Sequence, residues 1–171
     1  GTVSDCATGV WATSTDIGFG SQETSVVALS NVVLTNNATG ISVTDGPDNT
    51  KSVAVAISGG SISGGITGLS VSGADASVSS LATTAFSGQS GDYITLAGSA
   101  ANIDATTATF GGLTGAAATL AQNYAIANRV TDIVDAAGLG LVRFTASKIY
   151  VSTASAAGAF QRAIDASATS D

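Results

Sequence analysis

The sequence has few of the side chains on which most enzymes and metal centres depend. Its 171 residues include no His and no Met, and only one Cys, one Pro and one Trp. Without His, the chain lacks the usual zinc ligand and the usual acid/base group near neutral pH. The single Cys6 excludes an internal disulfide, and we expect either a small buried apolar residue or a thiol that pairs with another chain.

Charged residues are also scarce, at 10% of the chain against roughly 25% in globular proteins. Five Lys/Arg and twelve Asp/Glu give a net charge of −7, so the field of the protein repels nucleic-acid phosphate and anionic lipid. Nucleic acid is therefore not an expected partner. No apolar run reaches the roughly 18 residues that span a bilayer. The first residues lack the pattern of a signal peptide, so we expect any export signal to lie outside residues 1–171.

Glycine and small polar residues are abundant, with 21 Gly in the chain. The segment SISGGITGLSV (61–71) has the composition of a flexible linker, but its apolar residues share their spacing with those of VLTNNATGISV (33–43). Disorder also requires low hydrophobicity, whereas the mean hydropathy is +0.40. The shared spacing therefore indicates a structural repeat.

Apolar anchors recur every 24 to 31 residues and set a register for five segments, which begin at Val3, Leu34, Ile62, Phe86 and Phe110. A second set of anchors comprises Leu29, Ile57 and Leu81, and two inward columns follow the turn, Val10/Ile41/Leu69/Ile94 and Ala12/Val43/Val71/Leu96. Alternation of this kind is typical of half-buried strands. Units of this length with short strands and tight turns predict the rungs of a β-solenoid.

One column of the register predicts sharp corners between strands. It holds Asn36, Gly64 and Gly88, and Asn and Gly enter the left-handed backbone conformation at low cost. We therefore expect a positive φ at all three positions.

The pattern changes after Gly115. Apolar residues at three- and four-residue spacing predict an amphipathic helix over 116–137 that ends at Gly138. Alternation over 140–153 predicts a hairpin. A short helix over 159–168 would carry Phe160, Ala163, Ile164 and Ala168 on one side. The expected division is β-helix rungs in 1–115 and a helix–hairpin–helix junction or cap in 116–171.

With these residues in view, the chain resembles the right-handed parallel β-helix, or pectin-lyase-like, regions of very long secreted or cell-surface bacterial proteins. The segments DYITL (92–96), FGGLTG (110–115), 120–152 and FQRAIDA (160–166) resemble the junction that closes one β-helix there and introduces the next. The resemblance implies an all-β dominated fold with a small α+β cap, and an extracellular or cell-surface location.

Three groups of residues are candidates for function. Trp11 should point outward by register with Ser42 and could stack on a sugar ring, unless a neighbouring loop covers it. Asp45, Asp48 and Asn49 could offer oxygen ligands to calcium, or could form a solvated turn. For association end to end, the expected contacts are Val3 at one end and Ile149, Val151, Phe160 and Ile164 at the other.

Catalysis is not expected, although polysaccharide lyases and hydrolases share the β-helix architecture. Glycoside hydrolysis needs two carboxylates across a cleft, and β-elimination needs a positioned base. Residues 1–115 contain one basic residue, Lys51, and their acids fall at irregular places in the register. We therefore expect no cofactor apart from calcium, and a structural role as a stalk, filament or adhesin scaffold. A carbohydrate-binding module and, after it, a polysaccharide-degrading enzyme are the alternatives.

Overall fold

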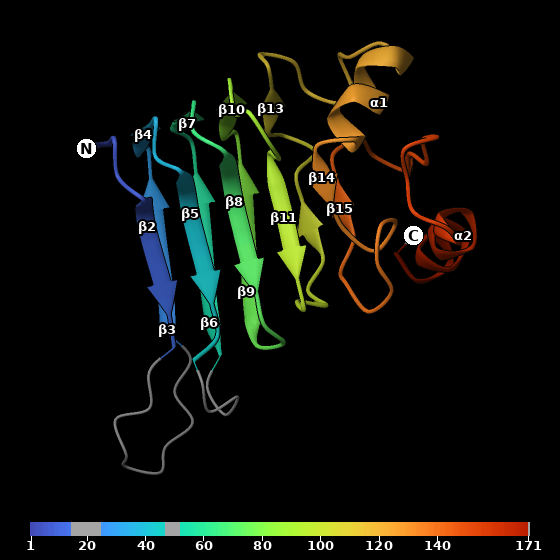
Figure 1. Cartoon of the computed structure of the whole chain (residues 1–171), viewed down its shortest axis with the longest axis horizontal. Helices are drawn as coiled ribbons and strands as arrows, with labels where there is room; N and C mark the ends of the chain where they lie inside the picture. Colours follow the sequence, from blue (N-terminus) through green and yellow to red (C-terminus); the bar gives the residue numbers. More distant parts are fainter. Residues whose placement is uncertain (15–24, 47–51, 171) are drawn as a thin grey trace.

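The computed structural model describes residues 1–14, 25–46 and 52–170, with only the backbone for residues 168–170. These residues form a row of short strands, with one helix before the last two strands and a second helix after them (Figure 1). The strands are β1 (Thr2–Ser4), β2 (Thr8–Thr13), β3 (Ser25–Ser30), β4 (Val33–Thr35), β5 (Thr39–Thr44), β6 (Val53–Ser58), β7 (Ser61–Ser63), β8 (Thr67–Ser72), β9 (Ala76–Ala82), β10 (Ala85–Ser87), β11 (Ile94–Ala97), β12 (Ile103–Asp104), β13 (Thr109–Phe110), β14 (Val130–Thr131) and β15 (Val142–Arg143). The helices are α1 (Leu120–Ala127) and α2 (Ala159–Ser170).

The strands pair in parallel between successive turns of a β-solenoid, as the sequence predicts. The β1 sheet has the order β1-β4-β7-β10-β13, the β2 sheet β2-β5-β8-β11-β14 and the β3 sheet β3-β6-β9. Val3 pairs with Leu34, which pairs with Ile62, and the column continues through Phe86 to Phe110. The predicted register is therefore confirmed at all five anchors.

The inward columns form the core of the solenoid. Val10, Ile41, Leu69 and Ile94 pair in sequence across the β2 sheet, and Val130 extends the column. Leu69 and Ile94 are fully buried. Because each turn places the same kind of side chain above the last, a chain with few bulky residues still buries a continuous apolar column.

Aromatic rings replace the aliphatic columns towards the C-terminal end. The rings of Phe86 and Phe110 stack with centroids 5.5 Å apart, and Phe144 meets Phe110 edge-on at 6.1 Å. Tyr150 then stacks on Phe144 at 5.3 Å and contacts Tyr124 at 5.7 Å. Such pairs contribute beyond their buried area, so the ladder joins the last turns to the residues that follow them.

The predicted corners have the left-handed backbone, with φ of 54° at Asn36, 66° at Gly64 and 71° at Gly88. Next to them, the amides of two buried side chains bond to the preceding turn. Asn37 Nδ2 donates to Val3 O at 3.0 Å, and Gln89 Nε2 donates to Ile62 O at 2.8 Å.

Six side-chain hydroxyls likewise donate a hydrogen bond to a backbone carbonyl of the preceding turn. The pairs are Ser63 to Leu34, Ser77 to Val53, Ser79 to Val55, Thr84 to Gly59, Ser90 to Gly65 and Ser99 to Ala76. Each of these side-chain donors therefore contacts the turn that precedes it in the chain.

The predicted helix over 116–137 is wrong in its extent. Helix α1 begins after the N-cap Thr119, whose capping box with Gln122 satisfies two backbone N–H groups, and it ends at Ala127. Val130 is then buried in β14, in register with Ile94. Apolar spacing alone does not separate a helix face from a short helix followed by a buried strand.

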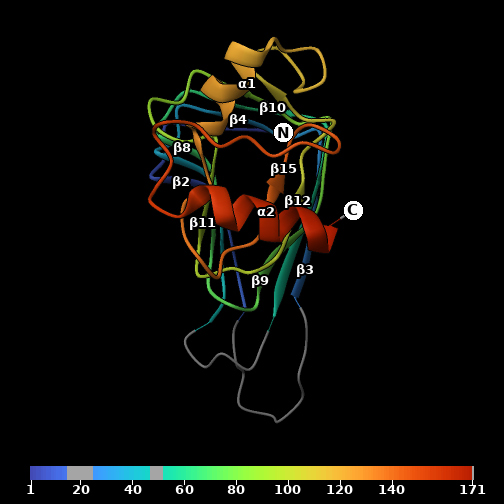
Figure 2. The same cartoon turned by 90° about the vertical axis from the view of Figure 1, so that its right-hand side faces the viewer.

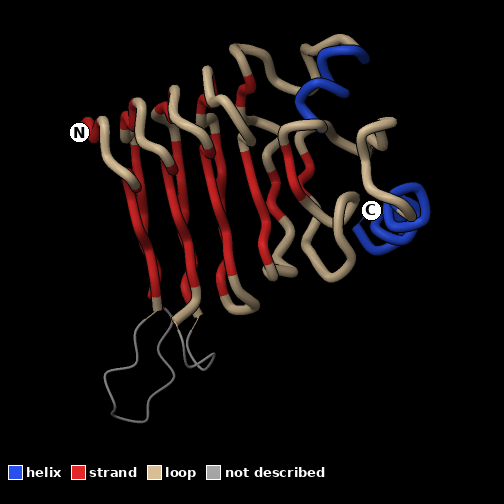
Figure 3. Tube along the Cα trace, viewed as in Figure 1, coloured by secondary structure: helices blue, strands red, loops and turns tan. Residues whose placement is uncertain are grey.

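The hairpin predicted over 140–153 is also wrong. Only Val142–Arg143 is a strand there, and it pairs in parallel with Ile103–Asp104. Alternation indicates a strand but not its partner, and here the partner is an earlier turn (Figure 3). The solenoid thus continues beyond residue 115, and Ile126, Val130, Val142 and Phe144 belong to the same core as the preceding turns.

Helix α2 lies across the end of the solenoid (Figure 2). It packs through a face of small residues, Ala159, Ala163 and Ala166, which are at most 9% exposed. Ala159 and Ala163 form a small separate cluster with Val134. The face that carries Phe160 and Ile164 is exposed, because the close approach of the helix uses the alanines.

Candidate functional site

Among the described residues, the first turn of the solenoid has an open edge. β1, β2 and β3 are each the outermost strand of their sheet, at the end that carries the N-terminus (Figure 1). We call this surface the first-turn edge, made of these strands and the inward side chains Val3, Val10, Val27 and Leu29, which are only half-buried. Their equivalents in the second turn, Leu34, Ile41, Val55 and Ile57, are 0–4% exposed. The core of the solenoid is therefore partly open at this end.

Sequence reasoning identified Val3 at this surface but not the other three side chains. Val10 and Leu29 were already assigned to inward columns. Following each inward column back to its first member would have placed Val10 and Leu29 at this edge, because the first residue of a column has a neighbouring turn on one side only.

The other residues predicted for end-to-end contact lie at the opposite end of the solenoid. Ile149 and Val151 are half-buried and pack on the small cluster under α2. Phe160 is 71% exposed and Ile164 is 46% exposed. The structure therefore brings these four residues together at one end of the solenoid and places Val3 at the other end.

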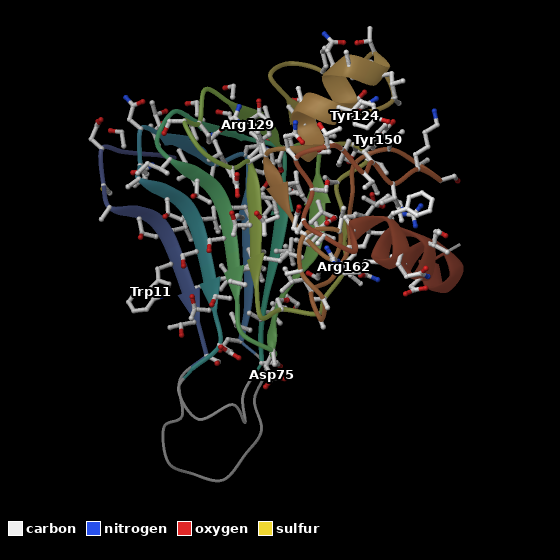
Figure 4. The ribbon with its side chains drawn as sticks, turned by 45° about the vertical axis from the view of Figure 1, so that its right-hand side comes forward. Trp11, Asp75, Tyr124, Arg129, Tyr150 and Arg162 are labelled. Carbon is white, nitrogen blue, oxygen red and sulfur yellow. The ribbon has the colours of Figure 1, made fainter. Side chains whose placement is uncertain are left out.

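Trp11 points away from the solenoid on the outer face of β2 (Figure 4). Its side chain is 70% exposed, and its register partner is Ser42. The same outward column continues through Ser70 and Thr95 to Thr131. The hydroxyls of Thr95 and Thr131 donate to Asp92 Oδ2 at 3.1 and 3.0 Å.

Of the predicted calcium ligands, Asp48 and Asn49 lie outside the described residues. Asp45 is described, and its Oδ2 accepts a hydrogen bond of 3.4 Å from the Asp75 N–H. Within the described ranges, no three His, Cys, Asp or Glu residues lie close enough together to hold a metal ion. The calcium proposal is therefore untested.

Cys6 is exposed, so the expectation of a buried apolar residue is wrong. Its thiol donates to Ser4 O at 3.2 Å. By register the position corresponds to that of Asn37, which is 2% exposed in the next turn.

Two arginines hold the C-terminal segment on the solenoid. Arg129 Nε donates to Gly91 O at 2.8 Å, Nη2 also contacts Gln89 O, and the guanidinium lies 3.9 Å from the centre of the Tyr93 ring. Arg162 on α2 bonds to carbonyls of Ile133 and Val134, with Nη2 2.5 Å from Val134 O. Both guanidinium groups thus satisfy backbone acceptors.

Asp132 is a buried acid in the segment that follows β14. It is 5% exposed and accepts hydrogen bonds from the N–H groups of Val134 at 2.8 Å and Val142 at 3.0 Å. Burial raises the pKa of Asp132 to about 6, although these two bonds act in the opposite direction. Asp132 connects β15 to the segment after β14, which is a structural role.

No helix in the described part of the chain is long and apolar enough to cross a membrane. Comparisons with family models, with curated proteins and with solved structures found no match to this chain. The parallel β-solenoid is shown by the strand pairing itself.

Proposed function

We propose that the protein is a non-catalytic structural segment of an extracellular or cell-surface bacterial protein, which associates end to end with copies of itself or with flanking modules of the same kind. The observation that carries the proposal is the first-turn edge. Unpaired strand edges template further pairing, and natural proteins cover them. A neighbouring solenoid turn would complete the three sheets and cover the half-buried valines at this end.

The two ends of the molecule differ, which supports a polar array. One end presents open strands and the other presents α2 (Figure 1). A contact between unlike ends is heterologous, and heterologous contacts continue into filaments unless rotation closes a ring. The resemblance to secreted β-helix regions supports the location and the role as a stalk or adhesin scaffold.

Val27→Lys should weaken association strongly, while Val26→Lys should leave it intact. Val27 is half-buried on the inner face of β3, whereas Val26 on the same strand is 68% exposed. In the separate chain a Lys at 27 can extend to solvent through the open edge, but in a stack its ammonium would be buried without a partner. Association should weaken by roughly tenfold or more, which is the effect of about 1.4 kcal/mol.

Analytical ultracentrifugation over a range of concentrations measures this, and circular dichroism checks that both variants fold. Because the contact is apolar and hydrogen-bonded, association should persist at high salt. A wild-type chain that stays monomeric at high concentration, or equal effects of the two substitutions, would contradict the proposal.

A second candidate function is carbohydrate binding through Trp11. The observation that favours it is the 70% exposure of this large aromatic side chain beside a column of hydroxyls on a flat sheet. Stacking on a sugar ring needs an open aromatic face, and neighbouring hydroxyls and the Asp92 carboxylate can bond to sugar hydroxyls.

Trp11→Ala should remove binding to polysaccharide if this candidate is right. Trp11 is the only Trp, so quenching of its fluorescence by soluble oligosaccharides reports contact directly. Tyr124→Ala is the matched control, because Tyr124 is a partly exposed aromatic at the other end. Equal retention of glycans by the wild type and Trp11→Ala would exclude this candidate.

A further inference from the structure

A groove lies at the C-terminal end of the molecule, between α2 and the segment that follows β15. Its volume is about 410 Å³, within the range of roughly 300–1,000 Å³ that is typical of small-molecule sites. We call it the C-terminal groove. Its lining comprises Tyr124, Arg143, Ser147, Lys148, Ile149, Val151, Phe160, Ala163, Ile164 and Ser167.

The walls of the C-terminal groove are apolar and accessible. Phe160 and Ile164 are 71% and 46% exposed, and Tyr124 is 37% exposed. Helix α2 is already anchored by its alanine face and by Arg162. The large apolar side chains on its other face are therefore not needed to hold the helix, and no described part of the chain covers them.

The charged residues that line the groove are basic. The chain has five Lys/Arg and a net charge of −7, yet Arg143 and Lys148 both line this groove, and no Asp or Glu among the described residues does. Arg143 also interacts electrostatically with Asp104, its register partner in β12. Lys148 is exposed and is the main source of positive charge.

We infer that the C-terminal groove binds a small anionic amphiphile, that is, a carboxylate attached to an aliphatic or aromatic body. The apolar body would lie on Phe160 and Ile164, and the carboxylate would pair with Lys148. Charge complementarity favours an anion, because the groove is a basic site on an acidic molecule. The volume of the groove favours a small molecule as its occupant.

Titration calorimetry of the intact chain with decanoate, below its micellar concentration, tests the inference. Decanoate should bind at one site, whereas decanol, which has no charge, and acetate, which has no apolar body, should bind more weakly. Lys148→Gln should weaken decanoate by roughly two- to fivefold, the range for an exposed charge pair. It should leave the affinity for decanol unchanged.

Phe160→Ala should weaken both decanoate and decanol, since it removes the shared apolar contact, and Trp11→Ala is the control outside the groove. Lys148 and Phe160 are exposed, so neither substitution should affect folding, and thermal melts check this. The inference is overturned if decanol binds as tightly as decanoate, or if Lys148→Gln binds decanoate unchanged. It is also overturned if decanoate binds only to associated chains, because a neighbouring copy would then form the site. Val27→Lys, which separates the copies, should bind decanoate normally.

Discussion

Gly65→Ala is expected to lower the free energy of unfolding by about 3 kcal/mol or more, because it combines backbone strain with a steric clash. Gly65 has a φ of 71°, and a Cβ built there would lie 1.8 Å from Asn37 O in the preceding turn. The left-handed backbone costs about 1–2 kcal/mol for a residue with a Cβ. The clash adds to this cost, since the obstacle is a backbone carbonyl that cannot rotate away.

Gly112→Ala separates the two causes. Gly112 also has a positive φ, of 90°, but a Cβ there would have no neighbour within 4 Å. This variant should therefore lose only about 1–2 kcal/mol. Chemical denaturation of both variants measures the difference, and equal losses would show that the turns are not stacked as closely as described.

The stability of the protein should decrease as the pH rises from about 4 to about 7, because Asp132 must ionise in a buried site. Its pKa is about 6 in the folded protein against 3.8 for an ordinary Asp. The folded chain therefore holds a proton that the unfolded chain releases, and stability is lost as pH rises through the folded-state pKa. A difference of about two pH units corresponds to about 3 kcal/mol.

Neighbouring acids do not reverse this expectation. Burial also raises the pKa of Asp135, which adds to the decrease. The pKa of Asp104 is lowered, mainly by its hydrogen bond from the Thr106 hydroxyl. The stability that the ionised Asp104 contributes is therefore lost only as the pH falls below the range of this test. Asp132→Asn should remove most of the pH dependence, whereas Asp5→Asn, at an exposed site, should retain it. Stability that rises with pH in this range would contradict the assignment.

The repeat could be predicted from the sequence because each inward column has the same kind of residue at the same step. The corners at Asn36, Gly64 and Gly88 could be predicted for a related reason, since few residue types adopt their backbone. A second column with positive φ, at Asn31, Gly59 and Thr83, could not, because Thr is not a residue that indicates such a corner. Prediction thus succeeded where the residue type itself determines the conformation.

The C-terminal segment could be predicted less well, because its contacts join residues far apart in the chain. Nothing near Arg129 in the sequence indicates that its guanidinium meets Gly91 O, 38 residues earlier. Likewise, the alternation around Val142 does not reveal Ile103 as its partner. Of the surfaces, the outward Trp11 followed from register, whereas the C-terminal groove depends on how α2 sits on the solenoid.

The direction of the side-chain bonds between turns gives the solenoid a chemical polarity. Asn37, Ser63, Gln89 and Ser99 each donate to a carbonyl in the turn before their own. In each of these side-chain bonds the donor belongs to the later turn and the carbonyl to the earlier one, whereas the backbone bonds between turns run in both directions. A chain that stacked on another in the same orientation could repeat side-chain bonds of this direction, whereas two first-turn edges brought face to face could not. For the proposed association end to end, these bonds therefore favour an array in which every unit faces the same way.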